Sequence, residues 1–71
     1  MAFTKEEIVD IFTYHAPKDG QLDRYLAIRL AAQDFALVLL DNTNPSADQS
    51  AAIRHLRECV MTANASIALE K

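Results

Sequence analysis

Apolar side chains recur at alternating intervals of three and four residues over most of the chain. In the segment from residue 21 to about residue 42, the positions with this spacing are Tyr25, Ile28, Ala32, Phe35 and Leu39. In the segment from residue 46 to about residue 69, they are Ile53, Leu56, Val60, Ala63 and Ile67. This spacing places apolar residues along one seam of an α-helix, as in a packed helix pair. The pattern predicts two long helices, at about residues 21–42 and 46–69.

The segment DNTNPS, residues 41–46, separates the two predicted helices. Asn42 and Asn44 favour turns, and Pro45 cannot continue a helix because it lacks a backbone N–H. Ser46 is followed three residues later by Gln49, the spacing of a capping box at a helix start. Because the connection is short, we expect the two helices to fold back as an antiparallel hairpin.

A third, shorter helix is predicted near the N-terminus. Thr4 and Glu7 have the spacing of a capping box, and Ile8, Ile11 and Phe12 then share one face of a helix that ends at about Phe12. Ala16 is expected to be extended because it precedes a proline, so no helix is expected through residues 14–16. The residues that follow, PKDG at 17–20, favour a turn before the second helix.

The sequence predicts an all-α fold with one helical-hairpin domain over residues 1–71. A domain of this size gains only about 3–5 kcal/mol from its own core, so it usually needs a further stabiliser. Cys59 is the only cysteine, and no metal-ligand spacing is visible, so neither a disulfide nor a metal or other cofactor is expected. Several apolar residues also lie outside the two seams, among them Leu26, Leu30, Val38, Leu40, Met61 and Leu69. A compact helical homo-oligomer is therefore expected.

Charge and hydropathy exclude several classes of function. The net charge of −3 argues against a DNA or RNA polymer as partner. No apolar run approaches the roughly 20 residues that span a bilayer, and the N-terminus lacks the pattern of a secretory signal. Together with the single cysteine, this predicts a cytoplasmic protein with no membrane partner.

Four arginines on the long helices are the first candidates for chemistry: Arg24, Arg29, Arg54 and Arg57. Guanidinium groups suit phosphates and carboxylates. One interpretation is that all four are solvated and paired with nearby acids, Arg57 with Glu58 and Arg24 with Asp23, and for Arg54 and Arg57 it is the preferred one. Arg29 borders an apolar face, so it is either another solvated side chain or the contact for an anionic ligand.

Three further residues each have more than one interpretation. Tyr14 lies in a loop, where its ring either packs on the hairpin or stacks on a base. His15 is either exposed to solvent or a hydrogen-bond donor to a ligand. Asn64, in the last helix, is exposed, interfacial or in contact with a base edge.

An enzyme is not expected. His55 lies four residues before Cys59 on the same predicted helix face, the arrangement of a possible nucleophile and base. No third group orients the histidine and no oxyanion loop is evident. We interpret Cys59 as a small buried apolar residue.

The sequence resembles a family of small phage proteins, the cyclic-oligonucleotide sponges that counter CBASS immunity and share a helical-hairpin domain with a Thoeris anti-defence sponge. The resemblance covers residues 12–68. It rests on three blocks in this order: YHAP, QLDRYLAIR followed by alanines, and VMTANASIA.

The resemblance implies a phage protein, acting in the cytoplasm of the infected bacterial host, that binds cyclic dinucleotides such as 3′,3′-cyclic GMP–AMP and keeps them from the CBASS effector without cleaving them. Some relatives also bind cyclic trinucleotides. It implies a homo-oligomer, often a hexamer, with pockets between protomers. Tyr14 would stack on a base and Arg29 would contact phosphate. Arg24, His15 and Asn64 are matched to ligand contacts only through their places in the three blocks. The alternative, from the residues alone, is a helical module that binds a protein through its apolar face; a third reading is a nucleotide hydrolase.

Overall fold

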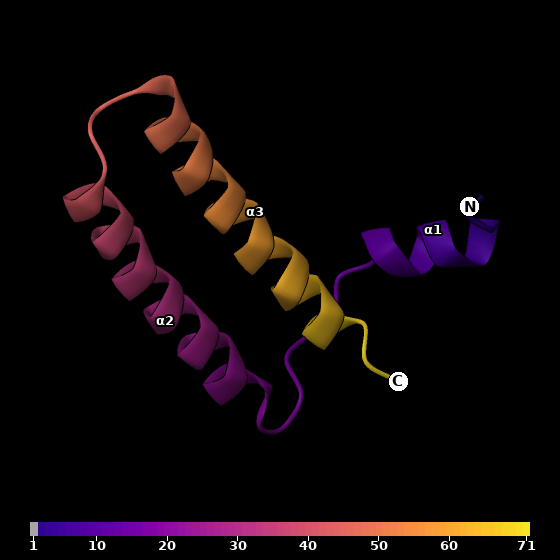
Figure 1. Cartoon of the computed structure of the whole chain (residues 1–71). Helices are drawn as coiled ribbons and strands as arrows, with labels where there is room; N and C mark the ends of the chain where they lie inside the picture. The colour runs from indigo at the N-terminus through magenta and orange to yellow at the C-terminus, as the bar shows by residue number, and fades with distance from the viewer. Residues whose placement is uncertain (1) are drawn as a thin grey trace.

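The computed structural model describes residues 2–71, which form three α-helices and no strand (Figure 1). These are α1 (Lys5–Phe12), α2 (Gln21–Asn42) and α3 (Ala47–Ala68). The predicted all-helical fold is confirmed, and the bounds agree to within a residue. Ser46 and Leu69, which the prediction included in the last helix, are its N-cap and C-cap.

Hydrogen bonds from side chains stabilise the connection between α2 and α3. The Ser46 hydroxyl accepts a hydrogen bond from the Gln49 backbone N–H at 3.1 Å. The predicted second capping box is only half present, because the Gln49 side chain does not return to Ser46. Its amide nitrogen instead donates to the carbonyl and hydroxyl oxygens of Thr43, at 3.1 and 3.0 Å. Gln49 therefore joins the two ends of the turn.

The turn before α2 depends on a glycine. Gly20 is the N-cap of α2 and has φ of 81°, in the left-handed region, and it makes no side-chain cap. A β-carbon at Gly20 would meet no atom within 4 Å, so the requirement for glycine comes from the backbone conformation alone. At the N-terminus of α1, the predicted capping box of Thr4 and Glu7 is confirmed.

Helices α2 and α3 pack side by side in opposite directions (Figure 1). The seam between them is thin, because a two-helix layer leaves one side of every seam residue uncovered. Ile67 is the one buried apolar side chain of residues 2–71, at 5% exposure. Most other seam residues are half-buried, Tyr25 among them. Phe35, which the spacing placed in the seam, stays 52% exposed.

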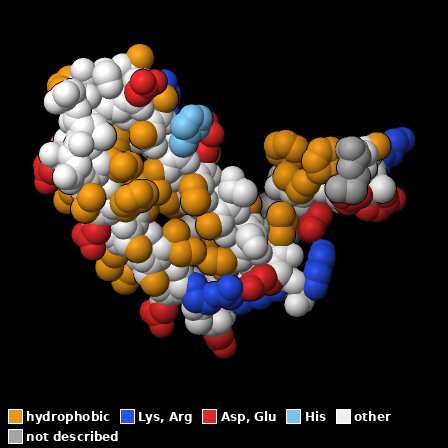
Figure 2. All heavy atoms as spheres, viewed as in Figure 1, with side chains coloured by type: hydrophobic (Ala, Val, Ile, Leu, Met, Phe, Trp, Pro, Cys, Tyr) orange, Lys and Arg blue, Asp and Glu red, His pale blue; other side chains and the backbone are white. Residues whose placement is uncertain are grey.

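Helix α1 projects from the hairpin beside the C-terminal end of α3 (Figure 1). It makes no helix-to-helix contact with α2 or α3. The off-seam apolar residues of the hairpin are therefore not covered by α1 of the same chain. Figure 2 shows apolar side chains spread over the visible face of the hairpin.

The shape of the chain is extended, at 44 × 31 × 16 Å. The radius of gyration is 15.4 Å, whereas a compact domain of this length has about 11 Å. The chain exposes 5999 Å² of surface, against about 4,400 Å² for a compact monomer of its mass. Among the residues described, no helix combines the length and the apolar character that crossing a bilayer requires.

Candidate functional site

Tyr14 projects into solvent from the loop between α1 and α2. Its side chain is 83% exposed and makes no hydrogen bond to any of residues 2–71. The interpretation that its ring packs on the hairpin of its own chain is therefore wrong. An exposed tyrosine ring presents a flat apolar surface and a free hydroxyl to whatever binds beside the loop.

The side chain of His15, one residue later, points back toward α1. Its Nε2 lies 2.8 Å from the backbone oxygen of Asp10 and 3.5 Å from the Asp10 carboxylate. The ring is half-buried, so the reading of a solvent-exposed loop histidine is wrong. Because a carbonyl oxygen accepts only, Nε2 carries the proton in this bond. Lys71 also contacts Asp10, with its Nζ 3.3 Å from Oδ2.

Arg24 forms a bidentate ion pair with Glu70, near the C-terminus. Its Nη1 and Nη2 lie 2.7 and 2.9 Å from the two carboxylate oxygens. This hydrogen bonding raises the pKa of Arg24 and lowers the pKa of Glu70, favouring the charged forms of both. Asp23, the acid nearest in sequence, makes no ion pair with it. The Arg24 guanidinium is thus already matched by a carboxylate of its own chain.

Gln21 is the residue at this end of the hairpin that the sequence did not indicate. It is 5% exposed, the one buried polar side chain among residues 2–71. Its side-chain oxygen Oε1 accepts a hydrogen bond from the Lys18 backbone N–H at 2.9 Å. Its side-chain nitrogen Nε2 donates to the Ile67 backbone carbonyl at 3.0 Å. The amide nitrogen also reaches the Glu70 carboxylate at 3.3 Å. A helix-start glutamine has no periodicity signal, so only the tertiary contact reveals this role.

Arg29 and Arg57 lie on the same side of the hairpin and flank a hollow of about 450 Å³, here named the Arg29/Arg57 groove. Seven further residues line this groove, and all but one of them are apolar: Ala32, Gln33, Ala36, Ile53, Leu56, Val60 and Met61. Both arginines are exposed, and neither forms an ion pair within residues 2–71. The expected pairing of Arg57 with Glu58 is wrong, since Glu58 lies 3.8 Å from His55. Two free guanidinium groups therefore border one apolar surface.

A second hollow of about 360 Å³ adjoins the Arg29/Arg57 groove, shares Ala32, Leu56 and Val60 with it, and has no charged lining residue. Ile28, Ala31, Phe35 and Ala63 line it together with Cys59. Cys59 is exposed, so the prediction of a buried thiol is wrong for the single chain. The side chain of His55 is 77% exposed and contacts Glu58.

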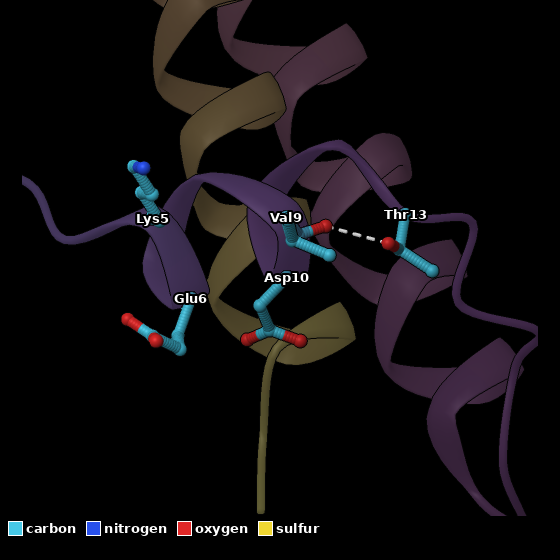
Figure 3. Close-up of a pocket in the computed structure, with 5 residues that line it drawn as sticks. All are labelled: Lys5, Glu6, Val9, Asp10 and Thr13. Carbon is cyan, nitrogen blue, oxygen red and sulfur yellow. Dashed lines mark hydrogen bonds between the residues drawn. The ribbon is translucent and has the colours of Figure 1, made fainter.

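Asn64 is half-buried on α3, and its side-chain oxygen is buried without a hydrogen-bond partner. A buried acceptor of this kind normally has a donor. Helix α1 carries a further hollow of about 400 Å³, lined by Lys5, Glu6, Val9, Asp10 and Thr13 (Figure 3). Within residues 2–71, no three His, Cys, Asp or Glu side chains gather as metal ligands would.

The predicted site residues thus occupy separate places in one chain. Tyr14 and His15 lie in the loop after α1, Arg24 is bound to Glu70, and Arg29 faces its groove. Tyr14 lines none of the three hollows. Arg57, interpreted as a surface residue, is brought beside Arg29; its position three residues before the seam residue Val60 was the available signal.

A family model described as the Acb2/Tad1 hairpin domain matches residues 4–68. The chain belongs to this family. The match spans all three helices, and it confirms the resemblance to the sponges of CBASS and Thoeris anti-defence. No curated protein and no solved structure gives a significant match. Membership of the Acb2/Tad1 hairpin family implies an anti-defence sponge role and suggests cyclic oligonucleotide signals as the ligands.

Proposed function

We propose that this Acb2/Tad1 hairpin protein binds cyclic dinucleotide immune signals, with 3′,3′-cyclic GMP–AMP as the representative ligand, and withholds them from the CBASS effector without cleaving them. The observation that carries this proposal is Tyr14, a tyrosine ring left 83% exposed in a fold that belongs to a sponge family. The cytoplasm of the infected bacterial host is where this protein would meet its ligand.

Stacking and charge supply the affinity. A base stacked on an aromatic side chain contributes about 1–3 kcal/mol, and a cyclic dinucleotide offers two bases. Arg29 forms no ion pair within residues 2–71, so its guanidinium is available for a phosphate. Since Tyr14 and Arg29 share no hollow in one chain, the pocket lies between protomers of a homo-oligomer, for which a hexamer is the proposed form.

The other three residues predicted to contact the ligand, Arg24, His15 and Asn64, differ in how available they are in the single chain. Arg24 must leave Glu70 to contact a phosphate, and His15 is committed to Asp10 through Nε2. In the single chain His15 therefore ties the loop to α1, and Arg24 ties the start of α2 to the C-terminal segment. The Asn64 side-chain oxygen is an acceptor without a partner and would suit a base N–H, but it is buried in the single chain, so the side chain must turn outward to reach a ligand.

Calorimetry with 3′,3′-cyclic GMP–AMP tests the proposal. Tyr14→Ala and Arg29→Ala are each expected to weaken binding by roughly 5–150-fold, the loss that corresponds to about 1–3 kcal/mol. Tyr14→Phe retains the stacking surface and is expected to bind nearly as the wild type does. Arg54→Ala is the matched control, because Arg54 is also exposed and free of ion pairs but borders none of the three hollows.

Two results would contradict the proposal. One is the absence of binding heat for every cyclic dinucleotide tried. The other is recovery of a linear product after the complex is heat-denatured, which would indicate a hydrolase. Equal affinity of the Tyr14, Arg29 and Arg54 variants would move the site elsewhere on the protein.

A further inference from the structure

The segment that follows α3 is bound to the start of α2 through Glu70. The Nη1 and Nη2 atoms of Arg24 donate to the two Glu70 carboxylate oxygens at 2.7 and 2.9 Å. The Gln21 side-chain nitrogen reaches the same carboxylate at 3.3 Å, and the Lys18 Nζ reaches the Glu70 backbone oxygen at 3.4 Å. Three donor side chains therefore hold one residue of the C-terminal segment. We name these four residues, Lys18, Gln21, Arg24 and Glu70, the Glu70 cluster.

Lys71 extends the contacts of this cluster to α1 and to the loop between α1 and α2, here named the Tyr14 loop. The Lys71 Nζ lies 3.3 Å from the Oδ2 atom of Asp10. The backbone oxygen of Asp10 accepts a hydrogen bond from His15, the residue after Tyr14, at 2.8 Å. A continuous series of contacts therefore leads from the Glu70 cluster to the neighbour of Tyr14.

The part of the chain before the cluster has little other attachment to the hairpin. Within residues 2–71, one hydrogen bond or ion pair joins residues 2–17 to the rest of the chain, and it is the contact between Lys71 and Asp10. Helix α1 makes no helix-to-helix contact with α2 or α3. Because Glu70 immediately precedes Lys71, the cluster determines whether the lysine side chain can reach α1. The orientation of α1 and of the loop after it therefore depends on the Glu70 cluster.

Arg24 could serve the proposed ligand site in two ways, which predict opposite effects of Glu70. If Arg24 contacted the phosphate, Glu70 would compete with the ligand. If the two residues act together on the Tyr14 loop, the ligand needs both. The geometry favours the second, because both terminal nitrogens of Arg24 are bonded to Glu70, whose negative charge would repel a phosphate at the same place. Building on the proposed function, we propose that Arg24 and Glu70 are a pair of positioning residues that hold the Tyr14 loop in place for the cyclic dinucleotide, and that Arg24 does not itself contact the phosphate.

A double-mutant cycle, measured by calorimetry with 3′,3′-cyclic GMP–AMP, separates the two roles. Arg24→Ala and Glu70→Ala are each expected to weaken binding roughly 2–5-fold, as for the loss of an exposed ion pair, and the double variant should bind no more weakly than either. A direct phosphate contact would give another pattern, in which Arg24→Ala weakens binding by more than about tenfold and Glu70→Ala strengthens it. That pattern, additive losses in the double variant, or wild-type affinity of Glu70→Ala would overturn the proposal.

The order of the Tyr14 backbone amide tests the same pair without any ligand. In NMR relaxation experiments on ligand-free protein, Arg24→Ala and Glu70→Ala are each expected to lower the heteronuclear NOE of Tyr14 toward the value of a flexible segment. An unchanged NOE of Tyr14 in Glu70→Ala would overturn the proposal. Since no nucleotide is present, this result decides whether the pair holds the loop even where calorimetry finds that the wild type binds no cyclic dinucleotide.

Ser46→Ala is the control for a general loss of stability. Ser46 caps α3 at the other end of the hairpin, away from the Glu70 cluster. This variant is expected to leave the NOE of Tyr14 unchanged and the affinity within about twofold of the wild type, because distant sites act independently. A loss of Tyr14 order in Ser46→Ala equal to that in Glu70→Ala would show that destabilisation alone releases the loop, and the positioning role would be wrong.

Discussion

Gln21 links the start of α2 to the end of α3 through a single buried amide. The amide oxygen accepts a hydrogen bond from the backbone N–H of Lys18, in the turn before α2. The amide nitrogen donates to the backbone carbonyl of Ile67, in the last turn of α3. A buried glutamine keeps its place because all its polar atoms find partners. It thereby fixes the position of the loop that carries Tyr14.

We expect Gln21→Ala to lower the free energy of unfolding by about 1–3 kcal/mol. The reason is that the Lys18 N–H and the Ile67 carbonyl lose their partner in a region closed to water. Urea denaturation at a fixed protein concentration measures this loss. Gln33→Ala is the control, because Gln33 is exposed and makes no hydrogen bond within residues 2–71, and it should cost less than about 0.5 kcal/mol. Equal stability of the two variants would contradict the role assigned to Gln21.

The arginines show why sequence proximity misleads about ion pairs. Asp23 and Glu58 are adjacent in sequence to Arg24 and Arg57, and neither forms the expected pair. Side chains one residue apart on a helix point about 100° away from each other, so they do not face one another. Arg24 instead pairs with Glu70, 46 residues along the chain, because the hairpin brings the two helix ends together.

The start of α3 depends on the cap at Ser46, whose hydroxyl accepts from the Gln49 N–H. We expect Ser46→Ala to lower the free energy of unfolding by about 1 kcal/mol, since an N-terminal amide of the helix loses its acceptor. Ser66→Ala, at an exposed position inside α3, serves as the control and should be neutral or slightly stabilising because alanine has the higher helix propensity. Urea titration of both variants decides; a destabilised Ser66→Ala with an unchanged Ser46→Ala would contradict the assignment of the cap.

The three helices differ in what supports them. Helices α2 and α3 support each other along their seam. Within residues 2–71, α1 is supported by its capping box, by the bonds of Thr13 to its last turn, and by the contacts of Asp10 with His15 and Lys71. It therefore has less packing support than the other two helices.

The whole molecule is open, with a radius of gyration of 15.4 Å and one buried apolar side chain, Ile67, among residues 2–71. If association provides the missing burial, the melting temperature will rise with protein concentration. We expect an increase of about 5–10 °C over a hundredfold range of concentration, measured by calorimetry or circular dichroism. A melting temperature independent of concentration would indicate a stable monomer.

The sequence by itself determined the three helices and their ends. The signals were local: the three-and-four spacing, the caps at Thr4 and Ser46, and the breaks at Gly20 and Pro45 act through neighbouring residues. It also identified the family through three blocks in order, and the family match over residues 4–68 confirmed it. Tyr14 and Arg29 as ligand contacts remain predictions.

Only the tertiary structure decided which side chains face one another. The exposure of Tyr14 and Cys59, the bond from His15 to Asp10, the pairing of Arg24 with Glu70 and the burial of Gln21 all depend on how α1 leaves the hairpin and how α2 meets α3. The same holds for Arg57, which joins Arg29 at one groove because two helices that run in opposite directions place them there. Spacing along one helix gives the direction of a side chain, whereas its neighbours come from the packing of a second helix.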